Sequence, residues 1–149
     1  MIDQKYHGKG AFIMSGPSLY KLDAHKSIHD GVVSEGKEIL DLLIKVLGEN
    51  QKEHAKMAAE ALVEHWETRL IAHADSEEET FYDDMAKKQP ELQEQITKLK
   101  RDHDLFRILS NEIKELIGKK DIDDEIIDRF KAIYVLAQIH NQQEEEVLF

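Results

Sequence analysis

The sequence lacks cysteine altogether and has only two prolines and seven glycines among its 149 residues. Without cysteine the protein can form no disulfide, no thiolate zinc site and no iron–sulfur cluster, and it has no cysteine nucleophile. The scarcity of proline and glycine leaves few turn signals and favours long helices. Any metal that the chain binds must therefore be held by nitrogen and oxygen ligands.

Basic residues are also in the minority, with 20 against 31 acidic residues and a formal net charge of -11. This balance argues against nucleic-acid binding, because few cations are available to neutralise phosphates. No apolar run approaches the roughly 20 residues of a membrane-spanning helix, and the start of the chain lacks a secretory apolar segment. We expect a soluble, cytoplasmic, single-domain protein that binds neither nucleic acid nor membrane. Nothing indicates its oligomeric state.

Apolar residues recur at three- and four-residue steps in four long segments, which predicts four amphipathic helices. The helices are expected at about residues 19–47, 52–85, 90–117 and from Asp121–Asp124 to the end, where these aspartates supply N-caps. Residues 1–18 show no such period and are predicted to form an N-terminal arm. Four amphipathic helices joined by short loops must pack as antiparallel neighbours. The predicted fold is all-α, an up-down antiparallel four-helix bundle over residues 19–149.

A string of histidine, three residues and three glutamates occurs twice, starting at His73 and at His140. At about 100° per residue, the histidine and the first glutamate of each string lie on one helix face, one turn apart. That face carries the apolar stripe, so Glu77 and Glu144 are expected to be buried. Glu78 and Glu145 are predicted to point away from the core and to be solvated.

Histidines also lie on the inner faces of the other two helices, His25 and His29 on the first and His103 on the third. The chain thus resembles two helical hairpins of one plan, which would bring ligands from all four helices to one point. Two buried carboxylates at the same depth repel each other and are costly unless they are paired or bind a metal. Two divalent cations, bridged by the carboxylates and bound by neutral imidazoles, would remove this conflict. Alternatively, each histidine is a core residue satisfied by a neighbouring helix.

Imidazole and carboxylate ligands suit iron, zinc or manganese, and a paired site in a bundle core suits iron best. Ferritin-like di-iron proteins use Glu-x-x-His motifs, which this chain does not contain. A histidine-rich di-iron site is therefore predicted.

These motifs together resemble the hemerythrin family, including the bacterial HHE cation-binding domains, from about Leu19 to Phe149. The matching features are the residues around His25, the pair His73 and Glu77, His103 on the third helix, the pair His140 and Glu144, and the ending Glu145–Phe149. The resemblance implies two non-haem iron ions with an oxo or hydroxo bridge. It also implies a small diatomic or peroxide ligand.

Two positions depart from the oxygen-carrying members of that family. Their second histidine on the third helix is replaced by Arg107, and their apolar or aromatic residue one turn after the first ligand is replaced by His29. Our hypothesis is that the three-histidine iron changes sides. One iron would take His25, His29 and His73, the other His103 and His140, and Glu77 and Glu144 would bridge them. Alternatively, His29 only faces the core or a partner.

Arg107 has two possible roles. It could pair with a carboxylate or an anion near the less coordinated iron, or its stem could cover the core while the guanidinium reaches solvent. His54 and His65 are expected to be exposed or packed behind a ligand. Trp66 is expected in the core, above the metal pocket, and Tyr20 either near the site or anchoring the arm.

The predicted function is that of a non-haem di-iron protein that binds dioxygen, peroxide or nitric oxide. Its role would be oxygen, redox or iron sensing, storage, or repair of damaged iron centres. Whether it is an enzyme stays open: no serine or cysteine forms a credible triad with a histidine, but peroxidase- or catalase-like turnover is compatible with the site. The alternative function is a metal-free helical interaction module whose core histidines respond to pH.

Overall fold

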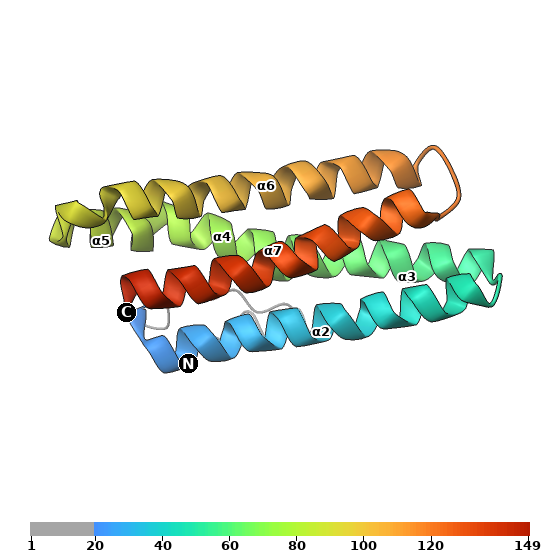
Figure 1. Ribbon diagram of the computed structural model, residues 1–149, viewed down its shortest axis with the longest axis horizontal. Coiled ribbons are helices and arrows are strands. Elements are labelled where there is room, and N and C mark those ends of the chain that lie inside the picture. The colour runs from blue at the N-terminus through green and yellow to red at the C-terminus, as the bar shows by residue number, and fades with distance from the viewer. Residues whose placement is uncertain (1–19) are drawn as a thin grey trace.

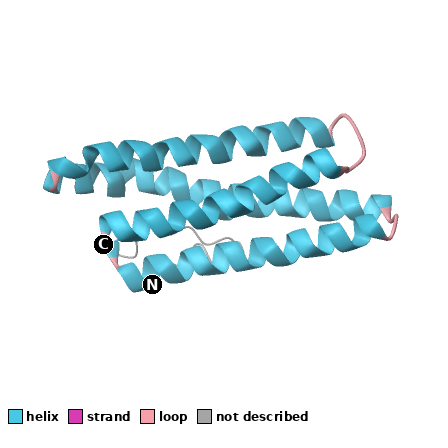
Figure 2. Ribbon diagram, in the orientation of Figure 1, coloured by secondary structure: helices cyan, strands magenta, loops and turns pink. Residues whose placement is uncertain are grey.

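The computed structural model describes residues 20–149, and within this range every regular element is a helix (Figures 1 and 2). Helix α2 spans Leu22–Gly48. The next stretch is continuous through α3 (Lys52–His65), η2 (Trp66–Ile71), α4 (Ala72–Ser76), η3 (Glu77–Phe81) and α5 (Tyr82–Lys88). After the short 3₁₀ turn η4 (Pro90–Leu92), α6 covers Gln93–Ile117 and α7 covers Asp124–Leu148. The predicted arm, residues 1–18, lies outside the described residues.

The helices pack antiparallel to their neighbours in the chain, which confirms the predicted four-helix bundle (Figure 1). Short connections force this arrangement. Asn50 takes a left-handed conformation, with φ of 59°, directly after α2, and the Asp123 side chain accepts a hydrogen bond from the backbone N–H of Ile126 at the start of α7. Because the chain runs up and down, the start of α2, the end of α7 and the α5–α6 turn lie at one end of the bundle.

The second helix of the bundle differs from the regular α-helix that the periodicity predicts. Two segments, η2 and η3, are π-helical, with hydrogen bonds from residue i+5 to residue i. In η2 the N–H of Ala72 donates to the carbonyl of Glu67, and in η3 the N–H of Tyr82 donates to that of Glu77. These wider turns lie on either side of His73, and they change which side chains share a face.

The buried side chains form two apolar clusters separated along the bundle. The larger cluster includes Val32, Leu70 and Phe106, and the smaller one contains Phe81, Tyr82, Ile96, Leu99 and Leu148. On the second helix, α6 and α7, the buried histidines and glutamates from His73 onward lie between residues of the two clusters, whereas His25 and His29 precede Val32 on α2. A polar layer is therefore closed off by apolar side chains on both sides along the bundle axis.

Within the described residues, no helix is both long and apolar enough to cross a membrane. The expected cytoplasmic location stays a prediction.

Gly36 provides a test of the packing. A Cβ at this position would lie 2.4 Å from the buried ring of Trp66, whereas one at Gly31 in the same helix meets nothing within 4 Å. We predict that Gly36→Ala lowers the free energy of unfolding by about 1–3 kcal/mol, because the ring must shift. Gly31→Ala should raise it by up to about 1 kcal/mol through helix propensity. Urea unfolding measures both, and equal effects would contradict the close approach of α2 to Trp66.

Candidate metal centre

The structure brings the seven predicted ligand residues into one buried cluster, with contributions from all four helices of the bundle. His25 and His29 come from α2, His73 and Glu77 from the second helix, His103 from α6, and His140 and Glu144 from α7. All seven are buried, and both glutamates are fully so. Their role as metal ligands stays a prediction, but their convergence on one point is a property of the fold.

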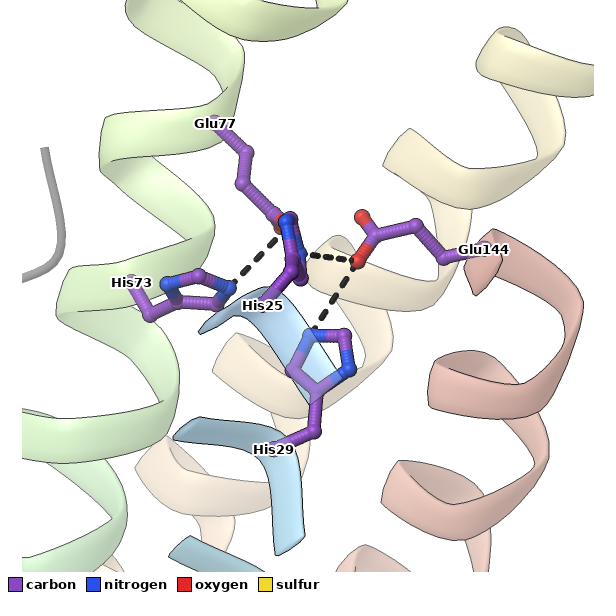
Figure 3. A group of neighbouring side chains, drawn as sticks. All are labelled: His25, His29, His73, Glu77 and Glu144. Carbon is purple, nitrogen blue, oxygen red and sulfur yellow. Dashed lines mark hydrogen bonds and ion pairs between the residues drawn. The ribbon is translucent and has the colours of Figure 1, made fainter. Parts of the chain in front are cut away.

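Three imidazoles surround one side of the two central glutamates, Glu77 and Glu144 (Figure 3). His25 Nε2 lies 2.9 Å from Glu77 Oε2 and 2.8 Å from Glu144 Oε1. His29 Nε2 is 3.2 Å from the same oxygen of Glu144, and His73 Nε2 is 3.1 Å from the same oxygen of Glu77. We call His25, His29 and His73 the first donor group.

Two imidazoles lie on the other side of these glutamates, and we call His103 and His140 the second donor group. His103 Nε2 is 3.1 Å from Glu77 Oε1, and His140 Nε2 is 3.7 Å from Glu144 Oε2. Each glutamate therefore presents one oxygen to each donor group. With the two glutamates included, the donor atoms on each side all lie within 4.8 Å of one another.

Three carboxylates outside the cluster orient the imidazoles. Glu145 accepts a hydrogen bond from His29 Nδ1 at 2.9 Å, Glu78 from His103 Nδ1 at 2.6 Å, and Asp102 from His140 Nδ1 at 2.8 Å. A proton held at Nδ1 leaves the Nε2 lone pair of the neutral ring free, as metal-binding histidines require. We call Glu78, Asp102 and Glu145 the outer carboxylates.

The prediction that Glu78 and Glu145 are solvated was wrong. Their side chains are only 28% and 18% exposed and bond to histidines of other helices. A residue that follows a buried glutamate is rotated by about 100°, which directs it toward the adjacent helix rather than into water. The repetition of consecutive glutamates in both strings is the signal that could have revealed them. Asp102 was also missed, and no pattern in the sequence sets it apart.

The cluster contains nitrogen atoms that protein groups do not satisfy. His103 and His140 each donate the Nδ1 proton to an outer carboxylate, and their Nε2 atoms are 3.2 Å apart, so one of these Nε2 atoms must carry a proton unless a cation lies between them. Among the described residues, His29 Nε2 and both ring nitrogens of His73 have no hydrogen-bond partner. A cation between these atoms would satisfy them, so the residues present fit a bound metal.

Protons compete for the same positions. Desolvation lowers the pKa of His25, but its hydrogen bonds to Glu144 and Glu77 outweigh this effect and raise the pKa to about 10. In the same way, desolvation lowers the pKa of His103, while Glu77 and Glu78 raise it to about 9. Burial would raise the pKa of Glu77, but the surrounding imidazoles hold it well below its usual range. At neutral pH the metal-free cluster therefore carries ionised carboxylates and protonated imidazoles.

Arg107 pairs with carboxylates, which is part of the first of its two predicted roles; an iron ion nearby stays a prediction. Its guanidinium donates to Asp75 at 2.6 Å, to Glu78 at 3.1 Å and to Asp104 at 3.1 Å, instead of extending freely into solvent. Glu78 in turn accepts from His103 Nδ1. A permanent positive charge is thus placed behind the carboxylate that orients His103, where it helps to keep Glu78 ionised.

The remaining predicted positions have mixed outcomes. His54 is exposed, as expected. His65 is buried and donates from Nε2 to the carbonyl of Val32 at 2.8 Å, so of its two expected positions the exposed one was wrong. Trp66 lies in the core as predicted. Tyr20 packs edge-on against Phe81, with ring centroids 5.1 Å apart, and its hydroxyl donates to Asp84.

Tyr82 is a site residue that the sequence did not reveal. Its side chain is fully buried, and its hydroxyl contacts Glu144, Glu77 and the Nε2 atom of His103. In a regular α-helix, a residue five positions after Glu77 would be about 140° away from it. The π turn η3 removes this offset, and nothing in the apolar periodicity indicates that turn.

A family model described as the hemerythrin HHE cation binding domain matches residues 22–149 of the chain. Neither the curated proteins nor the solved structures gave a significant match.

The outer carboxylates provide a first test of the site. We predict that Glu78→Ala weakens metal binding by about 10–100-fold, because His103 loses the acceptor that holds its Nδ1 proton. Glu79→Ala is the matched control, since Glu79 is the neighbouring residue and is exposed. Competition with a coloured chelator measures both affinities. Equal affinities for the two variants would show that Glu78 does not orient His103.

The protonated imidazoles lead to a prediction about pH. The pKa values of His25 and His103 are raised in the folded protein, because their protonated rings pair with carboxylates. These charged pairs stabilise the metal-free form, and the stabilisation is complete at pH values below the ordinary histidine pKa of about 6.5. That stability is lost as the pH rises through about 9 to 10. We therefore expect the metal-free protein to be less stable to urea at about pH 10 than at about pH 7.

The same protons must leave when a metal binds. Metal affinity should therefore increase as the pH rises, and binding at neutral pH should release protons. Titration calorimetry in two buffers of different ionisation enthalpy counts the protons released. A binding enthalpy that does not depend on the buffer would contradict this account.

Proposed function

Since the chain belongs to the hemerythrin HHE cation-binding domain family, we propose that the two donor groups hold two iron ions and that the loaded site binds a small ligand such as dioxygen, peroxide or nitric oxide. The first donor group would bind one ion and the second donor group the other. Glu77 and Glu144 would bridge them.

The observation that supports this proposal most strongly is the orientation of the two central glutamates. Glu77 presents Oε2 to His25 and His73 and Oε1 to His103. Glu144 presents Oε1 to His25 and His29 and Oε2 to His140. Carboxylates shared in this way suit two neighbouring ions, because a single ion would leave one donor group unsatisfied. Carboxylates that bridge two metals in the core of a bundle are a known design of di-iron proteins.

The donor set and the surroundings suit iron. Imidazole and carboxylate ligands suit iron, and bound iron would supply a redox-active ion with room for a small ligand. The apolar clusters above and below the site limit the entry of water and of larger molecules. The second donor group has one imidazole fewer than the first, so we place the incoming ligand on that side.

The chain's own residues would then perform separate tasks. The outer carboxylates hold the imidazole protons at Nδ1, and Arg107 keeps Glu78 charged. The central glutamates neutralise the ions. The residues that we describe support sensing, storage or repair of iron centres equally, because these roles differ in partners and turnover rather than in the ligands of the site. Turnover of added hydrogen peroxide would identify a catalase-like activity.

Metal analysis tests the proposal. Protein reconstituted with ferrous iron without oxygen should hold about two ions per chain and, after exposure to air, should show an absorption band that shifts with azide. His29→Ala should lose iron and change the spectrum, because it removes one imidazole of the first donor group. His54→Ala is the control, since His54 is an exposed histidine outside the cluster.

Other outcomes would point elsewhere. Full iron loading and an unchanged spectrum in His29→Ala would contradict the three-to-two division of the imidazoles. Stoichiometric zinc or manganese in place of iron would keep the metal site but would contradict the assignment of iron. A wild-type protein that binds no metal after reconstitution would instead support the metal-free interaction module.

A further inference from the structure

The hydroxyl of Tyr82 lies among the atoms of the second donor group. It is 3.3 Å from His103 Nε2 and 3.4 Å from Glu77 Oε1, and it donates a hydrogen bond to Glu144 Oε2. The ring of Tyr82 stacks on that of His103, with centroids 5.4 Å apart and planes inclined by 11°. A fully buried oxygen therefore meets both central glutamates and one imidazole at the same time.

The backbone gives Tyr82 this position. The π turn η3 bonds the N–H of Tyr82 to the carbonyl of Glu77, so the two residues are one turn apart on the same face of the helix. A π turn inside an α-helix is costly, and such turns often lie at functional sites. Here the turn adds an oxygen donor to a site that the regular periodicity would have left without it.

The two repeated strings show why the second donor group needs the oxygen of Tyr82. When His73 is aligned with His140, Tyr82 corresponds to Phe149. The Phe149 ring lies 5.1 Å from that of His25, in the first donor group, which already has three imidazoles. Tyr82 lies against the second donor group, which has two. The strings thus place the hydrocarbon ring of Phe149 beside the first donor group, with its three imidazoles, and the hydroxyl of Tyr82 beside the second donor group, with two.

We infer that the Tyr82 oxygen is itself a metal ligand and completes the second donor group, an inference that rests on the proposed function. Ligands around one ion with bonds of about 2.1 Å are separated by about 3 Å. The separations of 3.1 Å, 3.2 Å and 3.3 Å from His103 Nε2 to Glu77 Oε1, His140 Nε2 and the Tyr82 oxygen match this spacing.

Coordination by Tyr82 needs no oxidant or reductant. The phenol O–H bond breaks, an oxygen electron pair forms the bond to the ion, and the proton passes to solvent. Each ion then has five protein donors: the first binds three imidazoles and both glutamates, and the second binds two imidazoles, both glutamates and the phenolate. A small ligand on the second side must therefore compete with Tyr82, which restricts access to that ion.

Spectroscopy of the iron-loaded protein tests this inference. Protein loaded with ferrous iron and oxidised by air should show a visible phenolate-to-iron charge-transfer band, and excitation in that band should enhance tyrosine ring vibrations in the Raman spectrum. Tyr82→Phe should retain the iron and lose both signals. Tyr134→Phe is the matched control and should keep both, because Tyr134 lies on α7 beside a surface groove with Lys37 and Gln138.

The outcomes separate the two proposals. Two irons per chain in Tyr82→Phe together with an unchanged band would overturn the role of Tyr82 while leaving the di-iron site in place. A wild-type protein that does not load iron would overturn both. If Tyr82→Phe does not fold, the wild-type Raman spectrum decides: tyrosine modes that persist in Tyr134→Phe support the inference, and their absence from the wild type overturns it.

Discussion

The two central glutamates dominate the physics of this bundle. Glu77 and Glu144 are fully buried, and an oxygen of each approaches the Nε2 atom of His25. Burying an ionised carboxylate costs several kcal/mol unless opposite charge compensates, and two side by side also repel. Among the described residues, no lysine or arginine pairs with either of them. The negative charge of the two glutamates must therefore be compensated by histidines from all four helices, together with protons or metal ions. This requirement accounts for the polar layer in an otherwise apolar core.

The histidines depend in turn on a second set of charges. Three outer carboxylates accept the Nδ1 protons of His29, His103 and His140, so that the other nitrogen of each ring faces inward. On one side Arg107 extends this chain by holding Glu78. Part of the formal charge of -11 therefore belongs to the site rather than to the surface. The free energy of such a network is shared among its members, so the removal of an outer carboxylate would act on a bound metal through the imidazole that it orients.

The two halves of the site share a plan but differ in detail. The repeated strings supply equivalent histidines and glutamates. Among residues 20–149, however, only the second helix of the bundle contains π turns, whereas α7 is α-helical throughout. That local change brings the Tyr82 hydroxyl into the cluster, while the equivalent Phe149 contributes only its ring. The Tyr82 hydroxyl on one side and the extra imidazole of His29 on the other make the two halves of the site chemically different. Two ions held in the proposed way would therefore differ in the protein groups available to each.

The sequence by itself determined the four amphipathic helices, their antiparallel order and the convergence of five histidines and two glutamates, because periodicity along one helix shows which residues share its inner face. It did not determine the partners of Glu78 and Glu145, the burial of His65 or the position of Tyr82. Those depend on how far one helix is rotated and shifted against the next, and on two π turns that depart from the 3.6-residue period on which the prediction relied. Contacts between helices are set by the packing of all four at once, and only the tertiary structure decided them.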